Sequence, residues 1–202
     1  MSKSLTFYTN PMSRGQIARW MLEEVGCLYE TVILEYGDSM KSPEYLAINP
    51  MGKVPAIKHG ERVVTECAAI CAYLADAFPD AGLAPKPEDR ASYYRWLFYA
   101  AGPVEAAITN KSLGFDINPD QERMAGYGNY DRVVTVLDSL LRQGPYVTGG
   151  SFSAADVYLG SHIVWGMEFG TIRPRPAFEE YAKRVQSRDA YQRAQQMDGV
   201  DD

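Results

Sequence analysis

The 202-residue chain has few of the residues that build metal sites and disulfide frameworks. It contains three cysteines and two histidines, and it has no Cys-x-x-Cys pair. An odd cysteine count, together with an N-terminus that lacks the apolar core of a signal peptide, fits a reducing compartment. We therefore expect a cytoplasmic protein without a structural zinc or any other metal site.

Long apolar runs and basic clusters are also missing. No apolar run approaches the roughly 18 residues that a membrane-spanning helix needs. The net charge is −6, from 26 acidic and 20 basic residues, and no basic stripe breaks the acidic balance. This charge argues against nucleic acid and against anionic membrane surfaces as partners. The hydrophobic content of 46% is that of an ordinary globular protein, so a packed core is expected.

The first 78 residues alternate between strand and helix patterns. Apolar residues recur at helical spacing from Gly15 to Val25, and Gly26 is a natural helix end. Ser42-Pro43 is typical of a short helix start, and His59-Gly60 is a two-residue hairpin signal. The predicted order is βαβαββα, with strands at 4–9, 29–34, 55–58 and 61–65 and helices at 15–25, from 42 and at 66–78.

From residue 79 the character of the sequence changes. Residues 79–88 are rich in proline and indicate a linker, and no strand pattern follows them. Helices are predicted over 89–107, with an interruption at Gly102-Pro103, and over 119–142, 153–169, 176–185 and 189–196. We therefore predict an α/β domain at 1–78, a linker at 79–88 and an all-helical domain at 89–202.

The most informative stretch is Asn49–Ile57, which is followed closely by Thr65–Ile70. A proline at the first residue of a strand cannot donate to the ladder, so Pro55 belongs at a strand start. If the Val54-Pro55 bond is cis, the amide and carbonyl of Val54 point outward and can pair with an extended, peptide-like ligand. The helix that begins after Thr65 offers free N–H groups to a carboxylate. Together these features suggest a site for a small γ-glutamyl peptide.

Three stretches, taken with their order and spacing, resemble the cytosolic glutathione transferase family, and its bacterial type is the most similar. They are Asn10–Gly15 running into Trp20–Glu24, then Asn49–Pro55, then Thr65–Ile70. A fourth, Ser153–Asp156, resembles the family's helix-capping signature. The resemblance covers essentially the whole chain. It implies a thioredoxin-like N-terminal domain, an all-helical C-terminal domain, and a homodimeric enzyme of detoxification.

The resemblance also implies where glutathione would bind. The backbone of Val54, before Pro55, would pair with the cysteinyl backbone of glutathione, and Glu66 would hold the γ-glutamyl ammonium group. The carboxylate would meet Cys67 and the helix N–H groups. Cys67 stands where the family usually has serine, and a thiol is a weaker donor than a hydroxyl. Either it is a small side chain tolerated there, or it has a redox role.

The glycyl carboxylate of glutathione has two candidate partners. Lys53 and Lys41 both lie near the same loop in the sequence. The resemblance allows either lysine to pair with this carboxylate. For each of them, a solvated surface lysine is the competing interpretation.

The group that activates the thiol is expected in the turn after the first strand. A free thiol has a pKa of about 8.5, and lowering it by about two units requires roughly 2.7 kcal/mol. One hydrogen-bond donor and the positive end of a helix can supply that stabilisation. Ser13 is the first candidate, and Asn10 and Tyr8 are the next. Ser13 is equally plausible as the N-cap of the first helix.

The electrophile is expected to be apolar, in a pocket of the helical domain. Tyr99, Pro103 and Glu105, or alternatively Trp165 and Phe169, lie near that pocket by resemblance, whereas some aromatic residues of Tyr93–Tyr99 should pack in the core. The predicted function is glutathione conjugation, with glutathione as co-substrate and no permanently bound cofactor. Two alternatives remain: a glutathione-dependent peroxidase or thiol reductase that uses Cys67, and a non-catalytic glutathione-binding module.

Overall fold

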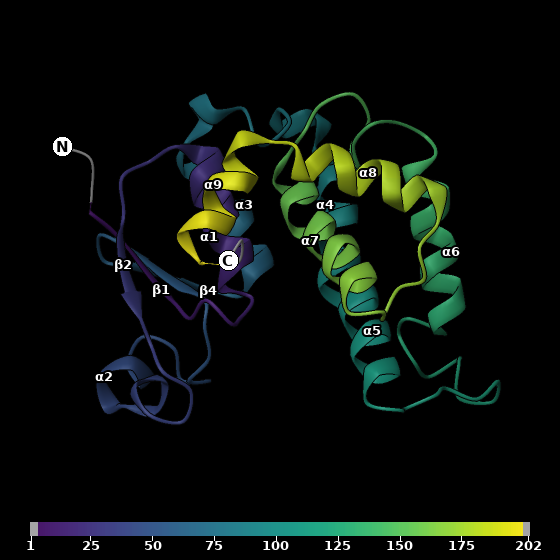
Figure 1. Ribbon diagram of the computed structural model, residues 1–202, viewed down its shortest axis with the longest axis horizontal. Coiled ribbons are helices and arrows are strands. Elements are labelled where there is room, and N and C mark those ends of the chain that lie inside the picture. The colour runs from purple at the N-terminus through teal and green to yellow at the C-terminus, as the bar shows by residue number, and fades with distance from the viewer. Residues whose placement is uncertain (1–3, 200–202) are drawn as a thin grey trace. The chain divides into compact units, whose positions relative to one another are not determined.

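The computed structural model describes residues 4–199, and its first half follows the predicted order of elements (Figure 1). These elements are β1 (Leu5–Thr9), α1 (Gly15–Val25), β2 (Glu30–Ile33), α2 (Pro43–Leu46), β3 (Ala56–His59), β4 (Arg62–Thr65) and α3 (Cys67–Ala77). The βαβαββα order confirms the predicted thioredoxin-like domain.

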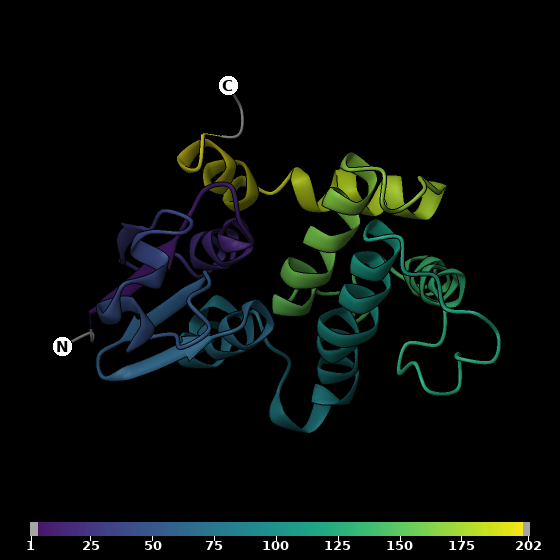
Figure 2. The same ribbon diagram turned by 90° about the horizontal axis from the view of Figure 1, so that it is seen from below.

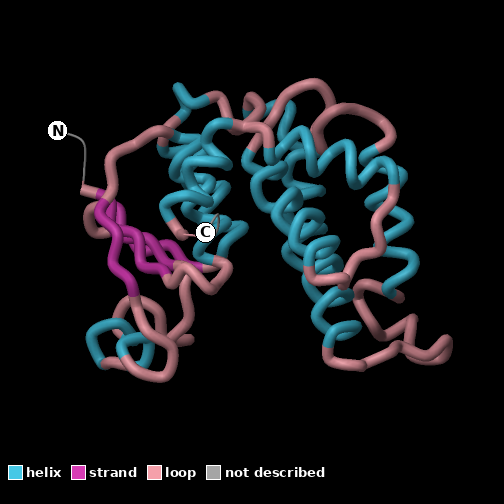
Figure 3. The backbone as a smooth tube through the Cα atoms, viewed as in Figure 1, coloured by secondary structure: helices cyan, strands magenta, loops and turns pink. Residues whose placement is uncertain are grey.

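The four strands form one mixed sheet with the order β2-β1-β3-β4 (Figure 3). β1 pairs in parallel with β2 and antiparallel with β3, which in turn pairs antiparallel with β4. Along β1, Leu5, Phe7 and Thr9 are buried, whereas Tyr8 is half-buried, because successive side chains of a strand face opposite sides of the sheet. Tyr8 therefore faces a separate cluster, built by Leu34, Met40, Tyr45 and Ala56.

The hairpin between β3 and β4 turns one residue later than predicted. His59 is still the last residue of β3 and pairs with Arg62, so the two turn residues are Gly60 and Glu61. Gly60 has a φ of 61°, the left-handed conformation that glycine adopts without steric cost. The alternation of the strand carries His59 into the ladder, where its ring nitrogen Nδ1 lies 2.9 Å from the Tyr73 hydroxyl.

The second half of the chain is helical. Its helices are α4 (Arg90–Tyr99), α5 (Glu105–Ser112), α6 (Tyr130–Leu141), α7 (Ala154–Glu168) and α8 (Pro176–Gln186). The interruption expected at Gly102-Pro103 is a π-helical turn over Ala100–Val104, because Pro103 has no N–H to donate to the helix. α7 is buried almost all round and forms the centre of this half. Among the described residues, no helix has the length and apolar character that crossing a membrane requires.

The helix predicted over 119–142 is wrong in its first half. Turns occupy this stretch until α6 begins at Tyr130, where Asn129 is the N-cap and accepts a hydrogen bond from the Arg132 amide at 2.8 Å. Gly126 and Gly128 precede that cap, and Gly128 has a φ of 71°. Glycines of this kind favour turns, so the apolar spacing that runs through α6 does not extend back to Pro119.

The last helix, α9 (Asp189–Met197), belongs with the sheet and not with the other helices. The chain forms two compact units, one of residues up to Leu83 together with those from Arg188 on, and one of Ala84–Ser187. α9 lies beside α1 in both ribbon views (Figures 1 and 2). Arg188 donates to both carboxylate oxygens of Glu24 at 2.6 and 2.7 Å. The sequence pattern assigns these residues to the helical domain because it records helical spacing and not which helix is the partner.

Candidate functional site

The loop before β3 presents a free stretch of backbone. The Val54-Pro55 peptide bond is cis, Pro55 is buried and Val54 is half-buried. Within the described residues, neither the amide nor the carbonyl of Val54 makes a hydrogen bond. Backbone groups in a folded protein are normally paired, so these two are available to an extended ligand.

Several side chains hold this loop in place. The Tyr45 hydroxyl donates to the Lys53 carbonyl at 2.6 Å, and the Asn49 side-chain amide donates to the same oxygen at 2.7 Å. Burial raises the pKa of Tyr45 to about 12, so its hydroxyl remains a donor at neutral pH. Sequence reasoning gave Tyr45 and Asn49 no role. The Asn49-Pro50 pair is typical of a turn closed by an asparagine side chain, and this signal could have identified Asn49.

Lys41 also supports the loop. Its ammonium group donates to the Gly52 carbonyl at 2.7 Å and approaches the Met51 carbonyl at 3.3 Å. A Cβ on Gly52 would lie 2.8 Å from the Lys41 nitrogen, so the glycine leaves room for this contact. The role predicted for Lys41 in binding the glycyl carboxylate stays a prediction, while the structure gives it a role in holding the loop. Lys53 has an exposed side chain.

Glu66 has an uncommon backbone conformation where β4 meets α3. Its φ of 67° is the only positive value among the described non-glycine residues, and its side chain is exposed. Such a conformation costs on the order of 1–3 kcal/mol and is concentrated at ligand-binding and active sites. The first amides of α3 have no intrahelical acceptor and carry the positive end of the helix. A carboxylate of Glu66 and a set of anion-binding amides thus lie next to each other.

Cys67 links the starts of α3 and α1. Its side chain is buried, and its sulfur donates to the Arg14 carbonyl at 3.4 Å. A thiol has a single proton, which this contact uses. One turn further along, burial raises the pKa of the Cys71 thiol well above its ordinary value, so Cys71 stays protonated. Among residues 4–199, no three His, Cys, Asp or Glu side chains gather closely enough to hold a metal ion.

The turn between β1 and α1 contains two of the predicted thiol-activating residues. The Ser13 hydroxyl donates to the Asn10 carbonyl at 2.6 Å and accepts from the Gly15 amide at 2.9 Å. The Asn10 side-chain amide donates to the Leu34 carbonyl at 2.9 Å, and its oxygen accepts from the Met12 amide at 2.9 Å. Ser13 therefore uses its only proton within the turn, whereas the amide of Asn10 has a second N–H. The expectation that Ser13 is the N-cap of the first helix is wrong, because Arg14 holds that position and, among the described residues, no side chain caps the helix.

Tyr8, the third candidate, lies on the same side of the sheet as the ligand-accessible loop. Its ring is 5.7 Å from the ring of Tyr45, and both Tyr8 and Val54 pack against the cluster around Tyr45. Thr9 is fully buried beneath α1, and a Cβ on Gly15 would lie only 1.9 Å from the Thr9 hydroxyl oxygen. Gly15 is thus required for the close approach of α1 to β1.

The three residues predicted for the electrophile pocket lie along one helical run in the second unit. Tyr99 is half-buried, its hydroxyl is 3.5 Å from the Val133 carbonyl, and burial raises its pKa. Pro103 lies in the π-helical turn. A carboxylate oxygen of Glu105 is 3.6 Å from Nε2 of His162, a residue to which sequence reasoning gave no role. Their contact with an electrophile stays a prediction.

The chain is similar to known glutathione S-transferases along most of its length. The family model for the glutathione S-transferase N-terminal domain matches residues 3–76. Glutathione S-transferase A of Pleuronectes platessa is 30% identical over 159 residues, which are 73% of this chain and 70% of that protein. The chain therefore belongs to the glutathione S-transferase family.

Two solved structures with bound glutathione share the whole fold. The theta class glutathione S-transferase of Xanthomonas axonopodis pv. citri is 28% identical, with a TM-score of 0.76 over 95% of this chain and 97% of that one. A sphingomonad glutathione S-transferase is 27% identical, with a TM-score of 0.78 over 96% of this chain and 99% of that one. Both were solved with glutathione.

Proposed function

We propose that this protein is a glutathione S-transferase that binds glutathione on its first unit. The amide and carbonyl of Val54 pair with the cysteinyl backbone, and the Glu66 carboxylate holds the γ-glutamyl ammonium group. The first amides of α3 receive the γ-glutamyl carboxylate, because the Cys67 thiol already donates to Arg14. The observation that carries this proposal is the unpaired backbone of Val54 in the unit that also presents Glu66 at a helix start.

The same proposal assigns thiolate stabilisation to Asn10. Its second amide N–H can donate to the sulfur, while Ser13 closes the turn that precedes α1. The thiolate sulfur then forms a bond to an electrophilic carbon of an apolar substrate, with Tyr99, Pro103 and Glu105 as the pocket. In a substitution, the bond to the leaving group breaks with its electron pair. Stabilisation of the anion and proximity of the two reactants supply the rate enhancement.

A homodimeric, cytoplasmic enzyme of detoxification is the setting that we propose for this chemistry. The alternative of a peroxidase or thiol reductase needs an accessible thiol, whereas Cys67 is buried and donates to a backbone carbonyl. A non-catalytic binding module would have no need for an activating group beside the ligand. Nothing in the described residues favours either alternative over the transferase.

Calorimetry with glutathione tests this function. The parent protein should bind glutathione with a dissociation constant below millimolar. Glu66→Gln should weaken binding by about tenfold, because a hydrogen bond to a charged group contributes about 1.5–3 kcal/mol. Glu61→Gln, an equally exposed acid in the neighbouring hairpin turn, is the matched control and should stay within about twofold of the parent. Absence of glutathione uptake by the parent at millimolar concentration would overturn the proposal.

A further inference from the structure

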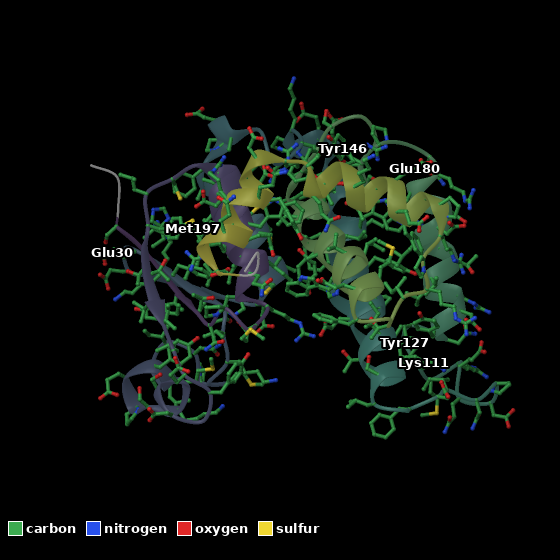
Figure 4. All side chains as sticks on the ribbon, viewed as in Figure 1. Glu30, Lys111, Tyr127, Tyr146, Glu180 and Met197 are labelled. Atoms are coloured by element: carbon green, nitrogen blue, oxygen red, sulfur yellow. The ribbon has the colours of Figure 1, made fainter. Side chains whose placement is uncertain are left out.

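A cavity of about 700 Å³ lies wholly within the helical unit. Its walls are the end of α5, the loop 113–129, the start of α6 and the segment 170–175. Figure 4 labels two of its lining residues, Lys111 and Tyr127, near the end of α5. None of the three residues predicted to contact the electrophile lines this cavity, so its chemistry needs a separate account. Its volume is in the range of sites that take a small organic ligand.

Three cations line the cavity around Tyr130. The Tyr130 hydroxyl donates to the Thr171 carbonyl at 2.5 Å, which fixes the ring at the cavity wall. Burial and the negative charge of Asp131 raise the pKa of Tyr130, and the positive charges of Arg173, Lys111 and Arg175 act in the opposite direction. These three charges therefore lie close to one phenol, in a protein whose net charge is −6.

The cations differ in how far they are neutralised. Lys111 pairs with Asp116 at 2.8 Å. Arg175 lies 3.5 Å from a carboxylate oxygen of Asp138, which already accepts two hydrogen bonds from Arg142. Arg173 is exposed and makes no ion pair with any described residue.

Asp131 also lines the cavity, so its walls carry three cations and two acids. Because Lys111 and Arg175 each lie near a carboxylate, the positive charge that a ligand can pair with is that of Arg173. A planar guanidinium group of this kind pairs with a carboxylate through two parallel hydrogen bonds.

The cavity lining also offers aromatic surface. Phe115 lines the cavity with 63% of its surface exposed, so its ring is accessible to a ligand. Tyr127 is half-buried, and its hydroxyl accepts from the Asn110 side-chain amide at 2.9 Å, which holds its ring in place. An aromatic ring in the cavity would cover Phe115 and gain stacking contacts with both rings.

We propose that this cavity binds a small aromatic carboxylate, with its ring against Phe115 and Tyr127 and its carboxylate on Arg173. The site gives the helical unit a ligand-binding activity of its own, which does not rest on the proposed glutathione chemistry. The ring system of such a ligand matches the aromatic side chains of the cavity, and its carboxylate matches the guanidinium group of Arg173. A large apolar ligand would remove Arg173 from water without pairing its charge, and this desolvation costs free energy.

Titration calorimetry with 2-naphthoate tests the proposal on the full chain. The parent protein should bind 2-naphthoate, and Arg173→Gln should weaken this binding at least tenfold. Arg132→Gln is the matched control, because Arg132 is an exposed arginine on α6 that does not line the cavity. It should bind as the parent does, within about twofold. Both variants should bind glutathione with the affinity of the parent, which separates this test from that of the proposed function.

Two further measurements make the result decisive. The neutral analogue 2-naphthamide should bind at least tenfold more weakly than 2-naphthoate, and amide chemical shifts should change at Tyr127 and Thr171 on addition of 2-naphthoate. Equal binding of the neutral analogue, or equal binding by Arg173→Gln, would overturn the assignment of the carboxylate to Arg173. Shift changes confined to the first unit would overturn the site itself.

Discussion

At the scale of single residues, the two polar side chains Asn10 and Ser13 have different roles in the turn after β1. Ser13 closes the turn on itself, through the Asn10 carbonyl and the Gly15 amide. The Asn10 side-chain amide donates one hydrogen bond to the Leu34 carbonyl, in the segment after β2. Its second amide proton is available to a ligand. The residue types alone leave this division open, because serine can both cap a helix and donate to a ligand.

The thiol pKa of bound glutathione distinguishes the two residues. Asn10→Ala should raise it by about one to two units, because one hydrogen bond to a charged group contributes about 1.5–3 kcal/mol. Ser13→Ala should leave this pKa unchanged and should lower the free energy of unfolding by about 1 kcal/mol, because the turn loses the hydrogen bonds of the serine hydroxyl. Ultraviolet titration of the bound thiolate and urea melts measure the two effects. A thiol pKa that rises in Ser13→Ala and not in Asn10→Ala would return the activating role to the serine.

At the scale of elements, the start of α7 shows how much one carboxylate can organise. Asp156 accepts hydrogen bonds from the Ser153 amide and hydroxyl, both at 3.0 Å, which confirms the predicted capping box. It also accepts from the Val147 amide at 2.8 Å and from the Tyr181 hydroxyl at 3.0 Å. The helix cap is therefore also the junction between α7, α8 and the loop before α7.

Asp156→Ala should lower the free energy of unfolding by about 2–4 kcal/mol, because it leaves several buried donors without an acceptor. Urea melts at neutral pH measure the loss. Glu180→Ala, which removes an exposed carboxylate on α8, should stay within about 0.5 kcal/mol of the parent. Coincident melts of Asp156→Ala and the parent would contradict the role of this side chain.

The same carboxylate should titrate in an unusual range. Burial raises the pKa of Asp156 from 3.8 to about 6, and its hydrogen bonds only partly offset this effect. A raised carboxyl pKa means that the folded state holds the proton between about pH 4 and pH 6 while the unfolded chain has lost it. The stabilisation from this protonation therefore falls as the pH rises through that window. A carbon-13 titration of the side-chain carboxyl measures the midpoint, and a midpoint near 4 would exclude the effect of burial.

How far the sequence predicts these elements depends on whether the information is local. Periodicity located α1 at Gly15–Val25, and Gly26 ends it with a φ of 68°. The cap of α7 was also predictable, because its partners are three residues apart. The Tyr45–Lys53 and Lys41–Gly52 contacts were not, because no local pattern tells which carbonyl a distant donor will reach. The start of α6 differs from these cases, because the Asn129 cap and the Arg132 amide are only three residues apart. The predicted helix over 119–142 followed the apolar spacing and passed over the turn-forming Gly126 and Gly128.

At the scale of the whole molecule, the last helix of the chain, α9, belongs to the same compact unit as the first 83 residues. The contact between α1 and α9 includes the Glu24–Arg188 pair, the Glu23–Arg193 pair at 3.1 Å and the rings of Trp20 and Tyr191 at 4.9 Å. The resemblance to a two-domain family predicts the two units but not that the last helix returns to the sheet. That assignment depends on contacts across more than 160 positions of sequence, such as Arg188 with Glu24 at a separation of 164.

Glu24→Gln tests the contribution of the Glu24–Arg188 pair to the packing of α9 on α1. The Glu24 side chain is only 4% exposed, and it accepts from Trp20 Nε1 at 2.9 Å as well as from Arg188. Loss of its charge should lower the free energy of unfolding by about 1–3 kcal/mol, measured by urea melts. Glu30→Gln, at an exposed position on β2, is the control and should leave the melt within about 0.5 kcal/mol of the parent. If the two variants unfold alike, the pair contributes no more than a solvated charge does.

The return of α9 also bears on how this protein can be divided. A fragment that stops after α3 would lack the helix that covers α1, and it would expose the face that carries Trp20, a side chain with 1% exposure in the intact chain. The part of the chain that carries Val54 and Glu66 therefore cannot be separated at α3 without losing a packing partner of α1. A chimera that exchanges this unit between relatives should also exchange the residues from Arg188 on.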